Sequence, residues 1–135
     1  MWLKKRNSEL TDEVIKLREL QKVLMMWIQD YQDGRRLISF FHKNGYKSIA
    51  IYGFADLGIA LCGELENTDV EVKYGIDRNA EMVYSEKTVY KPYDDLPPVD
   101  VVVVTAVHYF DDVKRDLEKK LSCPIISIED VIIGA

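Results

Sequence analysis

The chain has 135 residues, of which 47% are apolar and 30% charged, and its net charge is −5. These values are typical of one globular domain that buries its own core. The negative charge argues against nucleic acid as a partner, because binding to a phosphate backbone requires a concentrated positive surface. Cys62 and Cys123 are too few and too far apart for a disulfide framework or a metal knuckle. We therefore expect two buried thiols, no metal and a reducing, cytoplasmic location.

The first elements in chain order are helical. Basic residues follow Met1 without an apolar run behind them, which predicts neither a secretory signal nor a membrane span. A helix capped by Ser8 is predicted to run to Tyr31, because apolar residues recur at alternating spacings of four and three. A second short helix is predicted from Arg35 to Lys43, followed by a left-handed cap at Asn44-Gly45. Residues 1–45 thus form a helical extension of the domain in residues 46–135.

The apolar stripe of the first helix has a heptad character. Its members are Leu10, Val14, Leu17, Leu24, Ile28 and Tyr31, with Trp27, Met25 and Met26 alongside. Two interpretations are open: the stripe packs on the sheet of its own chain, or it pairs with a second copy or another protein. In the second case Gln21, which interrupts the stripe, would set the register, and a homodimer is the favoured assembly.

Strands and helices alternate after Gly45. Asp100 to Ala106 contains four consecutive valines, which indicates a central parallel strand that is buried on both faces. The other predicted strands are Lys47–Tyr52, Val70–Ile76, a weak one at Thr88–Tyr90, and Pro124–Ile128; the helices are Ala55–Glu66 and Tyr109–Leu121, with a short terminal turn. The polar stretch before Thr88 shows little helical pattern, so the second crossover helix is expected to be missing or reduced. Right-handed crossovers then predict an α/β fold, a Rossmann-like open parallel sheet in the order 3-2-1-4-5.

The turn after the first of these strands contains three small residues in a Gly-x-Gly-x-x-Gly arrangement, namely Gly53, Ala55 and Gly58. In this context Gly53 permits a tight turn, Ala55 lets the backbone approach a pyrophosphate, and Gly58 lets helix and strand pack closely. The free N–H groups of the first helical turn then face an anion. Two features weaken this prediction: the methyl group of Ala55 and the carboxylate of Asp56, which competes with an anion. The alternative is a turn that serves packing alone.

Asp77 ends the second strand of the predicted sheet, where a carboxylate can accept hydrogen bonds from the ribose of an adenosine. An acidic side chain there repels a 2′-phosphate, so NAD is favoured over NADP, although Arg78 softens the choice. The alternative for Asp77 is a loop residue that caps Asn79 or Ala80.

The loop after the valine strand faces the glycine turn across the point where the strand order reverses. Its polar residues Thr105 and His108 are therefore weak candidates for catalysis, with His108 as a proton donor or acceptor. The alternative for His108 is a cap or a surface residue. The full set of candidate nucleotide-binding residues is Gly53, Phe54, Ala55, Asp56, Leu57, Gly58, Asp77, Arg78, Thr105 and Ala106.

These segments resemble the Rossmann domains of bacterial polysaccharide-biosynthesis proteins, including the amino-terminal nucleotide-binding domains of capsular nucleotide-sugar epimerases and dehydratases. The resemblance spans Lys47 to Val131 and is carried by residues 49–58, 74–79, 99–106 and 125–131. It implies that NAD or a nucleotide sugar is the ligand, with Gly53, Ala55, Gly58 and Asp77 at the family's cofactor positions. The chain also departs from this family. Complete nucleotide-sugar epimerases carry a tyrosine that is followed four residues later by a lysine, and no tyrosine of this chain has that spacing. Tyr84 and Lys87 are three residues apart.

Three functions are consistent with these observations. The first is a stand-alone module that binds NAD, or another adenosine or uridine nucleotide, in a nucleotide-sugar pathway. The second is a small enzyme that uses His108 or Thr105. The third is an assembly protein that has kept the scaffold and lost its ligand, and that associates through its first helix. The scaffold alone does not rank them, because it supports many functions.

Overall fold

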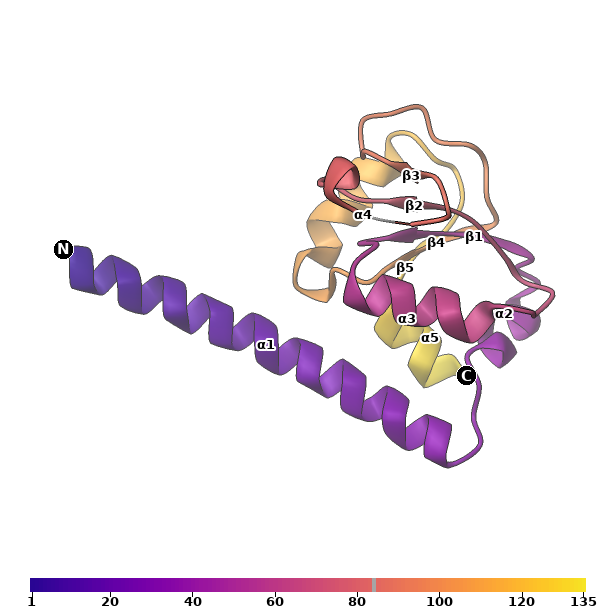
Figure 1. Ribbon diagram of the computed structural model, residues 1–135, viewed down its shortest axis with the longest axis horizontal. Coiled ribbons are helices and arrows are strands. Elements are labelled where there is room, and N and C mark those ends of the chain that lie inside the picture. Colours follow the sequence, from indigo (N-terminus) through magenta and orange to yellow (C-terminus); the bar gives the residue numbers. More distant parts are fainter. Residues whose placement is uncertain (84) are drawn as a thin grey trace.

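The computed structural model describes residues 1–83 and 85–135. Its strands form a parallel sheet in the order β3-β2-β1-β4-β5, which confirms the predicted fold class and strand order (Figure 1). The order reverses between β1 and β4, so the carboxyl ends of these two strands form the switch point of a doubly wound sheet. The strands are β1 (Ser48–Tyr52), β2 (Glu71–Ile76), β3 (Val89–Tyr90), β4 (Val101–Val104) and β5 (Ile125–Ser127).

Helices cover both faces of the sheet (Figure 1). One core cluster contains side chains of α1, α2, α3 and α5 against one face, and the second cluster contains side chains of α4 against the other. These helices are α1 (Trp2–Gln32), α2 (Ile38–Asn44), α3 (Asp56–Leu65), α4 (Phe110–Glu118) and α5 (Ile128–Gly134), with short 3₁₀ turns η1 (Ala80–Met82) and η2 (Val107–Tyr109).

The valine run behaves as predicted. All four residues of β4 are fully buried: Val101 and Val103 belong to the cluster under α1 and α3, and Val102 and Val104 to the cluster under α4. Alternate residues of a strand point to opposite faces, so β-branched side chains at every position fill both cores.

Several helix bounds differ from prediction: α2 begins at Ile38 and not at Arg35, α4 ends at Glu118 and not at Leu121, and the largest differences are in α1 and the last helix. α1 begins at Trp2, so Ser8 lies inside the helix and does not cap it; the strong helix formers before it extend the helix toward the amino end. The expected terminal turn is the helix α5. Ser127 caps it, accepting from the N–H of Glu129, while Asp130 accepts from the N–H of Ser127.

The second crossover helix is reduced, as the polar sequence predicted. Between β2 and β3 the described residues contain one short turn, η1. A cavity of about 630 Å³ lies between α3 and residues 85–87, on the face that a full crossover helix would cover. Cys62 lines this cavity, and both cysteines are half-buried where full burial was expected. Burial still raises the pKa of both thiols.

The carboxyl-terminal half of α1 packs on the domain. Val23 is fully buried, and the indole Nε1 of Trp27 donates to Oε1 of Glu64 on α3 at 2.8 Å. The second oxygen of Glu64 accepts from the N–H of Leu37 at 2.7 Å, just before α2. One carboxylate therefore joins α1, α2 and α3. Among the described residues, no helix has the length and apolar content that crossing a membrane requires.

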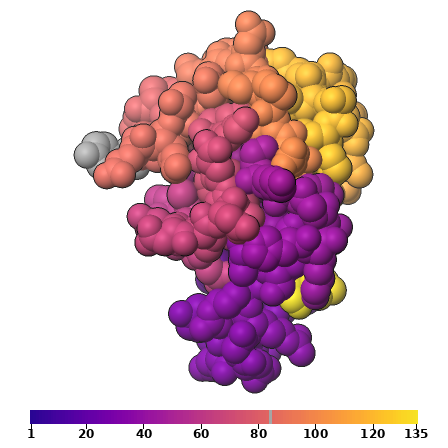
Figure 2. All heavy atoms as spheres, turned by 90° about the vertical axis from the view of Figure 1, so that its right-hand side faces the viewer, coloured from indigo at the N-terminus to yellow at the C-terminus, as the bar shows by residue number. Residues whose placement is uncertain are grey.

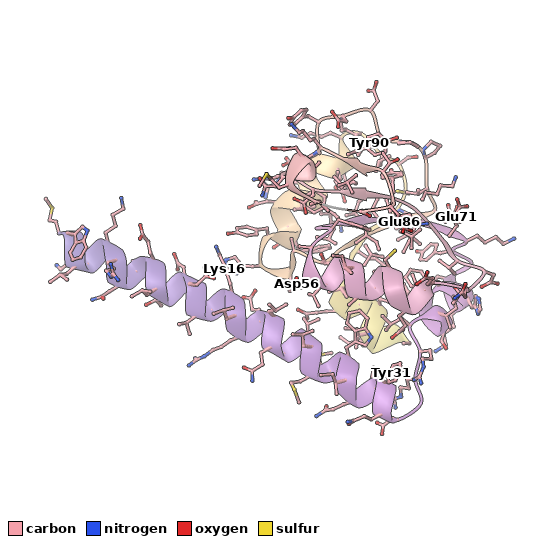
Figure 3. The ribbon with its side chains drawn as sticks, viewed as in Figure 1. Lys16, Tyr31, Asp56, Glu71, Glu86 and Tyr90 are labelled. Atoms are coloured by element: carbon pink, nitrogen blue, oxygen red, sulfur yellow. The ribbon has the colours of Figure 1, made fainter. Side chains whose placement is uncertain are left out.

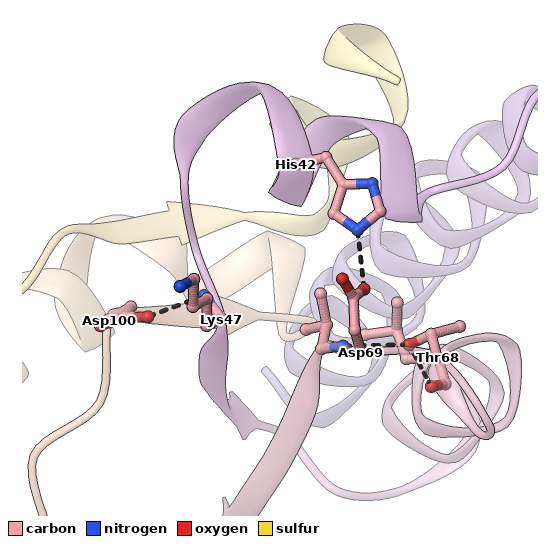
Figure 4. A network of polar contacts seen from close by, with 7 residues as sticks. His42, Lys47, Thr68, Asp69 and Asp100 are labelled. Carbon is pink, nitrogen blue, oxygen red and sulfur yellow. Dashed lines mark hydrogen bonds and ion pairs between the residues drawn. The ribbon is translucent and has the colours of Figure 1, made fainter.

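The short helix α2 lies beside the turn between α3 and β2, as the purple and magenta surfaces of Figure 2 show. His42 Nε2 lies 2.7 Å from an oxygen of Asp69 in that turn (Figure 4). Gly45 ends α2 with φ +69°, the left-handed cap that the sequence predicted.

Candidate functional site

The turn after β1 requires glycine at its first position. Gly53 has φ +86°, and a Cβ there would lie 2.5 Å from Oγ1 of Thr105. Its N–H donates to the carbonyl of Ile76 at 2.8 Å, which holds the turn against the end of β2. Conformation and space therefore both select glycine.

The third small position serves close packing. A Cβ on Gly58 would lie 2.3 Å from the carbonyl oxygen of Gly53, so only glycine lets the first turn of α3 approach the chain that enters it. This is the role predicted from the sequence.

Thr105, the residue directly after β4, stabilises the same turn. It is 8% exposed, and its Oγ1 lies 2.7 Å from the carbonyl oxygen of Gly53 and 3.0 Å from that of Tyr52. A hydroxyl has one proton, which here is directed to backbone oxygens of the turn. Thr105 thus positions the glycine turn, and it does not present its hydroxyl proton to a ligand.

The amino end of α3 has open donors. Ala55 precedes the helix with φ −107° and ψ −138°, and no side chain of residues 1–83 or 85–135 caps it. Within the described part of the chain, no oxygen accepts a hydrogen bond from the N–H groups of Ala55, Asp56 or Leu57. Such amides and the helix dipole attract an anion. The exposed carboxylate of Asp56 stands at this end of the helix (Figure 3), where it satisfies the dipole in the absence of a ligand.

Asp77 and the glycine turn are brought together. Oδ2 of Asp77 accepts from the N–H of Phe54 at 3.0 Å, and Oδ1 accepts from the N–H of Asn79 at 2.9 Å. The carboxylate of Asp77 therefore caps Asn79 and also lies beside the glycine turn, so both interpretations of this residue describe contacts that it makes. A carboxylate offers about four lone-pair sites, so two remain for further donors.

Two candidates contribute their backbone and not their side chains. Phe54 is 2% exposed, and its ring lies so close to β2 that a Cβ on Gly75 would be 2.6 Å from Cδ2. Leu57 is also buried in the core below α3. Gly75 was missed in the sequence, although a glycine inside a strand is a known signal of a close approach.

The side chains of His108 and Arg78 have partners other than the glycine turn. His108 is on η2, and its Nδ1 lies 3.2 Å from Oε2 of Glu19 on α1. The ammonium group of Lys16, also on α1, lies 5.0 Å from the ring centre of Tyr109. Sequence reasoning missed this contact, because nothing local indicates that α1 reaches the loop after β4. Arg78 is exposed, and its guanidinium, which donates a hydrogen bond to the hydroxyl oxygen of Tyr52, has a raised pKa.

The structure thus assembles one edge of the sheet from separate segments. The residues that it brings together are Gly53, Phe54, Ala55, Asp56, Gly58, Asp77, Thr105 and Ala106. Such an edge offers donors for an anion and an acceptor for hydroxyl groups. Tyr84, considered with Lys87 for tyrosine-lysine chemistry, lies outside the described residues.

Within residues 1–83 and 85–135, no three metal-binding side chains of His, Cys, Asp or Glu gather in one place. Comparison of the chain with protein-family models, with curated proteins and with solved structures gives no match.

Proposed function

We propose that the chain binds a nucleotide, with NAD as the first candidate, at the edge formed by the carboxyl ends of β1 and β2. The observation that supports this most is the place of Asp77, whose carboxylate lies 3.0 Å from the N–H of Phe54 in the glycine turn. An acceptor for ribose hydroxyls then stands beside donors for phosphate, which is the combination that a nucleotide requires.

The phosphate half of the proposal rests on the amides of Ala55, Asp56 and Leu57. They have no acceptor within the described chain, and they lie at the positive end of the α3 dipole. Asp56 opposes an anion at this place, but its side chain is exposed and free to turn to solvent.

The ribose half rests on Asp77. Two backbone N–H groups hold its carboxylate in place, so little conformational entropy is lost when a ribose hydroxyl donates to it. Its negative charge disfavours a 2′-phosphate, and NAD is therefore the expected ligand over NADP. A uridine nucleotide sugar is the second ligand to test, because of the resemblance to nucleotide-sugar enzymes.

We propose binding without catalysis by the chain alone. The side chains suited to catalysis are engaged: Thr105 braces the turn, and His108 faces Glu19. The module would present a nucleotide to partner enzymes of a sugar-modifying pathway.

The test is a thermal-shift and calorimetry panel of NAD, NADP, AMP and UDP-glucose. At a ligand concentration about a hundredfold above Kd, binding adds about 2.7 kcal/mol to the native state, which is a rise in Tm of about 8 °C or more for a domain of this size. We expect NAD to give this shift and NADP to give a smaller one.

Asp77→Asn is the informative variant, because it keeps the size of the side chain and removes the charge. We expect affinity for NAD to fall about tenfold or more. Asp94→Asn is the matched control, since Asp94 also accepts a backbone N–H, that of Lys91 at 2.8 Å, far from the glycine turn. Flat titrations with all four nucleotides would refute the proposal and favour a scaffold without a ligand.

A further inference from the structure

α1 carries an apolar face that its own domain leaves uncovered. Leu10 and Leu17 are each 54% exposed, and Ile28 is 49% exposed. The helix contacts the domain through a different face, with Leu20, Val23 and Trp27. The stripe that the sequence predicted is thus present and open to solvent.

The amino-terminal half of α1 buries none of its residues against the described part of the domain. Residues 2–15 are all exposed and extend away from the domain as a single rod (Figure 1). An isolated helix of this length is marginal in water, because packing of an apolar face supplies most helical stability in proteins. A partner packed along this segment would therefore stabilise it.

The pattern of the open face identifies the kind of partner. Its two heptad positions differ in composition: one carries leucine in four of five repeats, and the other alternates β-branched and amide side chains. The first set is Leu3, Leu10, Leu17, Leu24 and Tyr31, and the second is Asn7, Val14, Gln21 and Ile28. Leucine at the d position with β-branched residues at a favours two parallel strands.

We propose that α1 forms a parallel, in-register, two-stranded coiled coil with α1 of a second copy of this chain. The amides at the a position support this orientation. In a parallel pair Asn7 meets Asn7 of the second copy, and Gln21 meets Gln21, so that each amide finds a hydrogen-bond partner. In an antiparallel pair each would face a d-position side chain, which is Leu or Tyr, and a buried amide opposite Leu remains unsatisfied.

The positions that flank the stripe, e and g of the heptad, carry opposite charges where the two copies meet in this parallel register. Glu13 at position g faces Arg18 at position e of the second copy, and the described part of the chain offers neither of them an intrachain ion pair. One heptad later, the g position is Leu20, which packs on the domain, and the e position is Met25, which is 46% exposed. The charged pair of Glu13 and Arg18 is therefore the flanking contact to test.

The domain leaves room for the second helix. With 3.6 residues per turn, the centre of the open stripe lies roughly a third of a turn around the helix from Val23 and Trp27. Two-fold symmetry along the coiled coil then places the two domains on opposite sides of it. Beside the stripe is a groove of about 410 Å³ between α1 and α3, where the carboxyl-terminal part of the second helix would rest. It is lined by Leu24, Trp27, Ile28, Tyr31, Gln32 and Ala60.

The first test is the molar mass of the full chain, measured by light scattering after size-exclusion chromatography over a range of concentrations. We expect a dimer for the wild type and a monomer for the variant that carries both Leu10→Asp and Leu17→Asp. Ile15→Asp is the matched control, because Ile15 is 43% exposed on the same helix but lies outside the stripe; this variant should remain a dimer. A monomeric wild type, or a trimer, would overturn the proposal.

The second test concerns orientation. Cysteine introduced by Asn7→Cys should cross-link two chains under mild oxidation, because only a parallel register places residue 7 beside its own copy. The wild type, which retains Cys62 and Cys123, measures background cross-linking. A dimer that fails to cross-link through residue 7 contradicts the parallel arrangement.

The third test exchanges the flanking charges. Glu13→Arg alone and Arg18→Glu alone should each weaken the dimer about two- to fivefold, and the double variant should restore it. Absence of this rescue would place Glu13 and Arg18 outside the interface. None of the three measurements depends on nucleotide binding.

Discussion

The two apolar faces of α1 differ in the polar groups that they contain. On the face toward the domain, Val23 and Trp27 are buried, and the only polar atom of the Trp27 side chain donates to Glu64. The open face is interrupted at regular positions by Asn7 and Gln21. An amide in a buried seam lowers stability unless it meets a matching group, so the open face selects its partner while the domain face stabilises the fold.

The largest effect separates these two roles. Val23→Asp places a charge at a fully buried position, and we expect it to lower the free energy of unfolding by about 3–5 kcal/mol. Leu17→Asp makes the same chemical change on the open face. At concentrations where the chain is monomeric it should alter the free energy by less than about 0.5 kcal/mol.

Urea unfolding followed by tryptophan fluorescence measures both variants. Equal losses of stability for Val23→Asp and Leu17→Asp would show that the domain covers both faces in solution, and the comparison would fail.

The intermediate effect concerns Glu64, which closes the domain face. Its two oxygens accept from Nε1 of Trp27 and from the N–H of Leu37. Glu64→Gln replaces one acceptor with an NH₂ group that faces a donor, so we expect a loss of about 1–2 kcal/mol in monomer stability. Glu66→Gln, at an exposed neighbouring position, is the control and should be nearly neutral. If Glu64→Gln is also neutral, the two hydrogen bonds of Glu64 contribute nothing measurable to the attachment of α1.

Much of the fold could be predicted because the signals are local. The run from Val101 to Val104 indicated a central strand, and the spacing of Gly53 and Gly58 indicated a tight strand-to-helix turn. Asp77 was expected beside that turn, because the carboxyl ends of adjacent parallel strands share one edge.

What could not be predicted depends on tertiary contact. The heptad pattern predicted an apolar stripe on α1 but left open whether its own domain covers that stripe. The spacing of Val23 and Trp27 did not indicate a second face, because only the folded domain shows what these two side chains pack against. The contact of Glu19 with His108 joins segments that are distant in the chain, and it engages a residue that the sequence offered as a weak candidate for catalysis. The helix α5 could have been found, because Ser127 and Asp130 have the spacing of a capping box.

The smallest expected effect on stability is that of Asp100→Asn. Asp100 lies in a part of the domain that neither face of α1 contacts, so this variant is a reference for the comparison of the two faces. Oδ2 of Asp100 accepts from the N–H groups of Lys47 and Ser48 at 2.7 and 3.0 Å, and it joins the starts of β1 and β4 (Figure 4). These bonds hold the pKa of Asp100 below its ordinary value of 3.8.

A lowered pKa means that the carboxylate stabilises the fold above pH 3.8 and that this contribution disappears as the pH falls through the lower, folded-state pKa. Asp100→Asn should therefore be slightly less stable than the wild type at pH 7, and the two unfolding curves should converge in acid. A difference that persists or grows in acid well below pH 3.8 would show that the amide itself disturbs the strand ends.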